Sequence, residues 1–152
     1  MLCLQFSINS NFYGFEVGRI IEIVPKVPLR KILGAPDYIP GNFNYRSRLV
    51  PVVDLTMLAV KRETENILSS RIAVVRYMEK HYLGLLIENA TEILNINTDD
   101  ETLQPSGIKT DIPYMEKIST ENKEMFQFIN IEKILGEEVR KIIFPEIEEK
   151  AP

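Results

Sequence analysis

Few side chains in this sequence could carry out covalent or metal chemistry. The 152 residues include one His and one Cys, whereas a structural zinc site needs about four such ligands. His81 follows Lys80 at an expected strand turn, and because no nucleophile is placed near it the sequence favours an exposed turn residue. Cys3 has no Lys or Arg before Arg19, so the nearby positive charge that a reactive thiolate needs is missing.

Two other groups of residues could bind ions or phosphates, and neither has the required spacing. The acidic run Asp99, Asp100 and Glu101 lacks the ligand spacing of a calcium loop. Gly14 and Gly18 do not form a phosphate-binding motif. We therefore predict no catalytic residues, no cofactor and no metal site, and a protein that is not an enzyme.

The composition is that of an ordinary soluble globular protein. Hydrophobic residues are 45% and charged residues 26% of the chain. The formal net charge of -4 gives no reason to expect nucleic-acid binding. The sequence has no secretory signal pattern, and no apolar run approaches the ~20 residues that span a bilayer. We expect a cytoplasmic protein with no direct membrane insertion.

Short strands must position any site in this chain. Apolar and polar residues alternate from Leu2 to Ile8, turn-forming residues follow, and Phe12 to Val17 completes an expected hairpin. In total the pattern predicts nine or ten strands with little helix, and several all-β folds fit it, two small barrels among them. Pro51 lies in the strand expected over 48–55, which therefore should be an edge strand or carry a bulge.

The segment 36–55 holds the most specific pattern. Gly41 permits a close or left-handed backbone turn, and the Asn44 side chain can bond its own backbone in a turn. Asp54 is placed to cap a short helix that follows. Arg46 should stand near the mouth of the turn, where it could form a structural ion pair or dock a partner.

This segment resembles the CheW family of bacterial chemotaxis coupling proteins. The family pattern is aromatic-Ile-x-Gly-x-x-Asn-Leu-Arg-Gly, followed by an apolar strand through Pro-Val-x-Asp-Leu. The matching positions here are Tyr38, Ile39, Gly41, Asn44, Arg46, Pro51, Val52, Asp54 and Leu55. Weaker blocks match in order over roughly residues 2–136. Two departures are Tyr45 in place of Leu and Ser47 in place of Gly; the Cβ of Ser47 predicts a different local turn.

The resemblance implies an all-β fold of two packed five-stranded Src-homology-3-type barrels with a short C-terminal helix. We expect one CheW-like domain over residues 1–136, with a first barrel of roughly 1–60 plus the C-terminal helix and a second of roughly 70–130. Residues 137–152 would form the helix end and an acidic tail. That region is either a helix end packed on the first barrel with a solvated tail, or a segment that covers a docking groove or binds a partner.

The resemblance also implies a function and a set of partners. CheW-like proteins are non-catalytic adaptors that join the regulatory domain of a CheA-type histidine kinase to the cytoplasmic tip of chemoreceptors. The kinase would contact apolar surface of the second barrel. The expected partner-binding residues are Ile20, Glu22, Ile23, Gly41, Asn44 and Arg46.

Two other functions stay open on the sequence. One is a diverged CheW-like scaffold in a non-flagellar two-component pathway. The other is a small-molecule-binding β-barrel domain, which would need a concave pocket lined by convergent polar groups.

Overall fold

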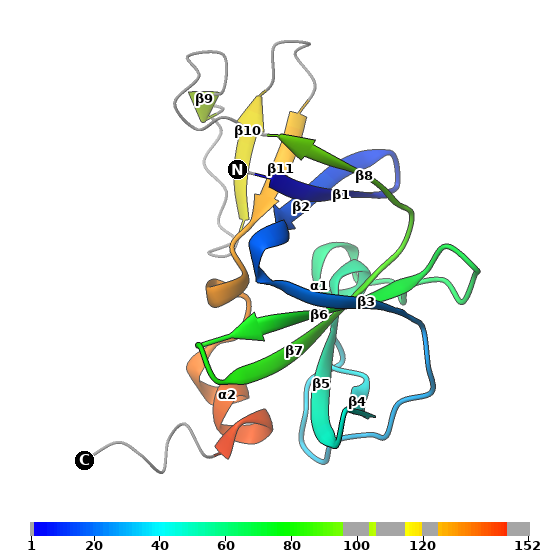
Figure 1. Ribbon diagram of the computed structural model, residues 1–152, viewed down its shortest axis with the longest axis vertical. Coiled ribbons are helices and arrows are strands. Elements are labelled where there is room, and N and C mark those ends of the chain that lie inside the picture. Colours follow the sequence, from blue (N-terminus) through cyan, green and yellow to red (C-terminus); the bar gives the residue numbers. More distant parts are fainter. Residues whose placement is uncertain (1, 96–103, 106–114, 120–124, 146–152) are drawn as a thin grey trace.

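The computed structural model forms two β-sheets, one above the other in Figure 1. It describes residues 2–95, 104–105, 115–119 and 125–145. One sheet has the order β8-β1-β2-β11-β10-β9 and the other β3-β6-β7-β5-β4. The predicted all-β class is therefore confirmed, with six strands in one sheet and five in the other.

The strands are short, and helices are few. The strands are β1 (Leu2–Ile8), β2 (Asn11–Glu16), β3 (Ile20–Pro25), β4 (Gly41–Tyr45), β5 (Arg48–Asp54), β6 (Arg71–Tyr77), β7 (His81–Ile87), β8 (Ala90–Asn95), β9 (Gln104–Pro105), β10 (Met115–Ser119) and β11 (Met125–Ile129). The α-helices are α1 (Leu55–Val60) and α2 (Glu137–Ile143), and single 3-10 turns cover Val17–Arg19 and Ile131–Lys133. Across the residues described, no helix is long and apolar enough to cross a membrane.

The two sheets interleave along the chain. The hairpin β1–β2 pairs with β8 and, in parallel, with β11. In the other sheet β3 pairs with β6, and the β4–β5 hairpin pairs with β7 through β5. These pairings differ from the expected division into residues 1–60 and 70–130. The difference arises because period-two alternation predicts that a segment is a strand without specifying its distant partner.

A shared core joins the two sheets. Its buried side chains come from both, and include Phe6, Phe15, Val53, Val75 and Leu85. The adjacent valines on β5 and β6 point to the opposite face of their sheet. There they form a smaller group, the outer cluster, whose buried members are Tyr45, Val50, Val52, Ile72, Val74 and Leu86. Because side chains alternate between faces along a strand, β5 and β6 are buried on both sides, and the outer cluster supports the β4–β5 hairpin.

β5 lies inside its sheet, between β4 and β7, so the expectation of an edge strand is wrong. Its register with β4 runs without a shift from Gly41↔Val52 to Tyr45↔Arg48, which also excludes a bulge at Pro51. Parallel pairing with β7 begins one residue later, at Val52↔Gly84. Pro51 therefore stands just before the β7 ladder starts, where a missing N–H costs little.

The helix α2 packs beside the β6–β7 hairpin (Figure 1), and its end borders a hollow that is also lined by Ile32, Arg48 and Pro51. Phe144, directly after α2, is buried, and its ring lies 5.5 Å from that of Tyr77 and 4.8 Å from that of His81. His81 is thus half-buried rather than fully exposed as predicted. The predicted acidic tail after Pro145 lies outside the described residues.

Candidate functional site

The β4–β5 hairpin turn presents Arg46. Tyr45 pairs with Arg48, so the loop has two residues, and both are left-handed: φ is 48° at Arg46 and 65° at Ser47. Two left-handed residues match the twist of the flanking strands. The Ser47 amide donates to Asn44 Oδ1 at 3.1 Å, which confirms the expected side-chain bond of Asn44. The altered turn predicted from the Cβ of Ser47 is wrong, because Ser47 adopts the positive φ.

At the other end of β4, Gly41 meets a geometric need. Its φ is 154°, and a Cβ there would lie 2.2 Å from the carbonyl oxygen of Arg30. That close approach allows Arg30 and Asn42 to exchange two backbone hydrogen bonds of 2.8 Å. Gly41 is buried, so its part in the site is to hold the irregular segment 26–40 against β4.

Glu22 on β3 joins the turn through one carboxylate oxygen. Arg46 Nη2 donates to Glu22 Oε1 at 2.8 Å, and the Tyr45 hydroxyl donates to the same oxygen at 2.5 Å. The Arg46 guanidinium carbon also stands 5.1 Å from the centre of the Tyr45 ring. The hydrogen bond to the carboxylate raises the pKa of the Tyr45 phenol, because it stabilises the protonated form; burial adds to this and Arg46 opposes it.

Ile20 and Ile23, the two isoleucines of β3 that were expected to bind a partner, differ in exposure. Ile20 is half-buried and packs against the shared core, whereas Ile23 is 43% exposed. The register between β3 and β6 shifts between Ile20 and Glu22, and β3 is an edge strand. Of the six expected residues, the structure brings Glu22 and Arg46 into contact and places Asn44 in the same turn. Ile20 and Ile23 share only the strand of Glu22, and Gly41 lies at the far end of β4.

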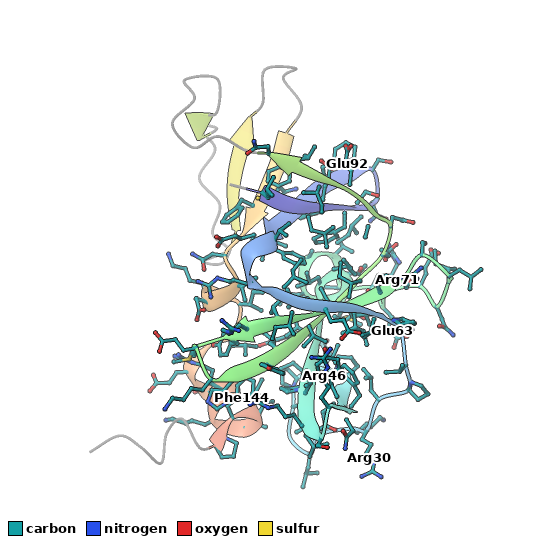
Figure 2. All side chains as sticks on the ribbon, in the orientation of Figure 1. Arg30, Arg46, Glu63, Arg71, Glu92 and Phe144 are labelled. Carbon is teal, nitrogen blue, oxygen red and sulfur yellow. The ribbon has the colours of Figure 1, made fainter. Side chains whose placement is uncertain are left out.

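Sequence reasoning missed the aromatic floor of this site, which we define as Phe43, Tyr45 and Tyr82. The ring of Tyr45 lies 6.3 Å from each of the other two. Arg48 stacks over Tyr82 at 4.2 Å. The alternation of Phe43 and Tyr45 along one strand was an available signal, whereas the approach of Tyr82 from β7 was not. Figure 2 labels Arg46 over this sheet and Phe144 beside α2.

The surroundings of Cys3 and of the described acidic side chains do not favour thiolate or metal chemistry. Burial raises the pKa of the Cys3 thiol to about 11, which disfavours the reactive thiolate. Within the residues that the structure describes, no group of three or more His, Cys, Asp and Glu side chains could hold a metal ion. The acidic run Asp99 to Glu101 lies outside those residues.

Known proteins resemble the chain along most of its length. Residues 2–139 match the family model described as CheW-like domain. The chain is 26% identical over 133 residues to "Chemotaxis protein CheW" of Helicobacter pylori, covering 87% of this chain and 79% of that protein. It is 22% identical over 144 residues to "Chemotaxis protein CheW" of Bacillus subtilis, covering 94% and 92%.

A solved structure has a similar fold. The crystal structure of scaffolding protein TtCheW from Thermoanaerobacter tengcongensis superposes with a TM-score of 0.79, at 22% identity and over 93% of this chain and 92% of that one. At this identity the likeness establishes the fold, and the family model, which spans nearly the whole chain, establishes the relationship. The chain belongs to the family of CheW-like domains.

Proposed function

We propose that this chain is a non-catalytic, cytoplasmic adaptor that couples chemoreceptors to a CheA-type histidine kinase in bacterial chemotaxis signalling. Membership of the CheW-like domain family supports the proposal. Relatives named chemotaxis protein CheW and the similar fold of the scaffolding protein TtCheW support it as well. The observation that carries it is the exposed ion pair between Glu22 on β3 and Arg46 in the β4–β5 turn, two of the residues that the family resemblance assigns to partner binding.

The site suits docking better than chemistry. The side chains of Arg46 and Glu22 are 68% and 42% exposed, and the exposed Ile23 follows Glu22 on the same edge strand. A charged pair at the exposed edge of a sheet can orient an amphipathic helix that docks there, and receptor tips in this family are helical hairpins. Glu22 and Arg46 would supply orientation and specificity. Ile23 pairs with Ala73 of the shared core, on the opposite face of the sheet from Glu22, so it would add apolar area only to a partner that also covers the edge of β3.

Coupling would follow from geometry and linkage. If one face of the molecule holds the kinase regulatory domain and this hairpin binds the receptor tip, a receptor rearrangement changes the relative populations of kinase states. The family resemblance implies that the kinase contact uses apolar surface of the second barrel, expected over roughly residues 70–130. No catalytic group of this chain takes part.

Calorimetric titration tests the proposal directly. The full chain is titrated with the CheA regulatory domain and, separately, with a receptor-tip fragment, both from the genome that encodes it. We expect saturable binding to each. If the chain binds no CheA regulatory domain and no receptor tip from that genome, the proposal is wrong.

A further inference from the structure

Tyr45 departs from the family pattern, and the structure gives its hydroxyl a defined contact. Tyr45 is only 7% exposed and belongs to the outer cluster, where its ring lies between those of Phe43 and Tyr82. From this buried position the hydroxyl reaches Glu22 Oε1 at 2.5 Å. The Leu that is usual at this position has no hydroxyl and could not make this bond.

Without a further contact, the Glu22–Arg46 ion pair above Tyr45 would be weakly ordered. Both side chains are substantially exposed, and holding two long exposed side chains in one geometry costs rotamer entropy that a solvated ion pair barely offsets. The Tyr45 ring is fixed by its neighbours, so its hydroxyl restrains the Glu22 carboxylate at little further entropic cost. The Tyr45 ring also lies under the Arg46 guanidinium, with 5.1 Å between the ring centre and the guanidinium carbon.

The arrangement leaves hydrogen-bonding capacity for a partner. Tyr45 and Arg46 both bond Oε1 of Glu22. Over the described stretches of the chain, neither Glu22 Oε2 nor Arg46 Nη1 has a hydrogen-bond partner. One acceptor and one donor therefore stand next to each other on a restrained, exposed pair.

We propose that Tyr45 is a positioning residue for partner docking. It holds the Glu22 carboxylate so that Glu22 and Arg46 together offer a preorganised acceptor and donor to polar groups on the docked helix. Preorganisation strengthens binding because fewer rotamers are lost when the partner arrives. This inference rests on the proposed function, since the docked partner is the receptor tip.

A double-mutant cycle on receptor-tip binding tests the role. Calorimetry compares the wild-type chain with Tyr45→Phe, Glu22→Gln and the double variant, using the same receptor-tip fragment. We expect Tyr45→Phe to weaken binding by about fivefold, the scale of immobilising one additional side chain, Glu22, when the partner docks. In the Glu22→Gln background the same substitution should change affinity by less than about twofold, because the bond it removes is already weakened.

A matched control removes the same atom from a buried ring outside the site. Tyr77→Phe deletes a hydroxyl that has no hydrogen-bond partner among the described residues, and we expect its receptor-tip affinity to equal that of the wild type. An independent readout is the pKa of Tyr45, followed by nuclear magnetic resonance of its ring carbons. Glu22→Gln should lower that pKa toward its usual value, since a neutral amide no longer favours the protonated phenol.

The possible failures are distinct. Wild-type affinity in Tyr45→Phe, with the wild-type chain binding the tip normally, overturns the positioning role and leaves the proposed function intact. An equal loss in both backgrounds, or a Tyr45 pKa that Glu22→Gln does not move, also overturns it. Absence of binding by the wild-type chain overturns the proposed function, and the docking role of Tyr45 with it.

Discussion

At the scale of the residue, Gly41 and Arg46 lie on the same hairpin and have different structural roles. Both stand at motif positions, and the family resemblance assigns both to partner binding. The buried Gly41 permits close backbone contact with Arg30, whereas the exposed Arg46 offers a guanidinium to solvent. One sequence motif therefore contains residues that hold the backbone beneath a surface, such as Gly41, and residues whose side chains are exposed on that surface, such as Arg46.

Substituting Gly41 should cost stability rather than a binding contact. Gly41→Ala places a methyl group 2.2 Å from the Arg30 carbonyl oxygen, at a φ of 154° that side-chain-bearing residues rarely adopt. We expect a loss of at least about 2 kcal/mol in the free energy of unfolding, because backbone must move and two hydrogen bonds are disturbed. Urea denaturation followed by circular dichroism measures it.

Gly136→Ala is the matched control for this substitution. A Cβ at Gly136 has no atom within 4 Å, and its φ of -73° suits any residue. We expect a loss of no more than about 1 kcal/mol in unfolding free energy, the scale of placing Ala at a helix N-cap. Equal stability of the Gly41 and Gly136 variants would contradict the structural role of Gly41.

At the scale of the element, Asp54 ties β5, α1 and the following loop together. Its side chain, in a residue 4% exposed, accepts from the backbone amides of Thr56, Met57 and Thr64 at 3.1, 3.2 and 3.0 Å. The Thr64 hydroxyl also donates to it, at 2.5 Å. The predicted helix cap is confirmed, and the same carboxylate anchors the loop as well.

Removing that carboxylate should destabilise the whole junction. Asp54→Ala leaves three backbone N–H groups without their acceptor in a buried place, and we expect a loss of about 2–4 kcal/mol in unfolding free energy. Asp37→Ala, at an exposed position in a turn, serves as the control and should stay near the wild type. Chemical denaturation of the two variants decides the matter; a change below about 0.5 kcal/mol for Asp54→Ala would contradict the structure.

How far the sequence predicts an element depends on how local its cause is. The β1–β2 hairpin follows from alternation around Asn9 and Ser10, whose φ values of 50° and 69° form the turn. The Asp54 cap is equally local. The parallel pairing of β2 with β11 is not local, nor is the contact between Glu22 and Tyr45, which joins an edge strand to a distant hairpin. From the sequence, only the family resemblance places Glu22 and Arg46 in the same expected binding site.

At the scale of the whole molecule, the two sheets interleave along the chain and share one hydrophobic core. Strands from the beginning and the later part of the chain form one sheet around a continuous middle segment that forms the other, and both contribute to the shared core. Neither sheet could be removed without exposing that core. Such a body can present separate surfaces in a fixed relation, which a scaffold requires.

If the surfaces are separate, a change at the hairpin should affect one partner only. Arg46→Glu puts a negative charge beside Glu22 and removes the donor offered to the receptor tip. We expect tip affinity to fall by at least about tenfold, while affinity for the CheA regulatory domain stays within about twofold. The melting temperature should stay near that of the wild type, because an ion pair this exposed contributes little to stability.

Arg48→Glu makes the same charge change two residues along the chain, over the ring of Tyr82. It should keep more of the tip affinity than Arg46→Glu does, since Arg48 lies outside the Glu22 pair. Calorimetry of both variants with both partners separates the outcomes. Parallel loss of both affinities would show that the two surfaces overlap, and a large fall in melting temperature for Arg46→Glu would instead make that residue a structural ion-pair partner.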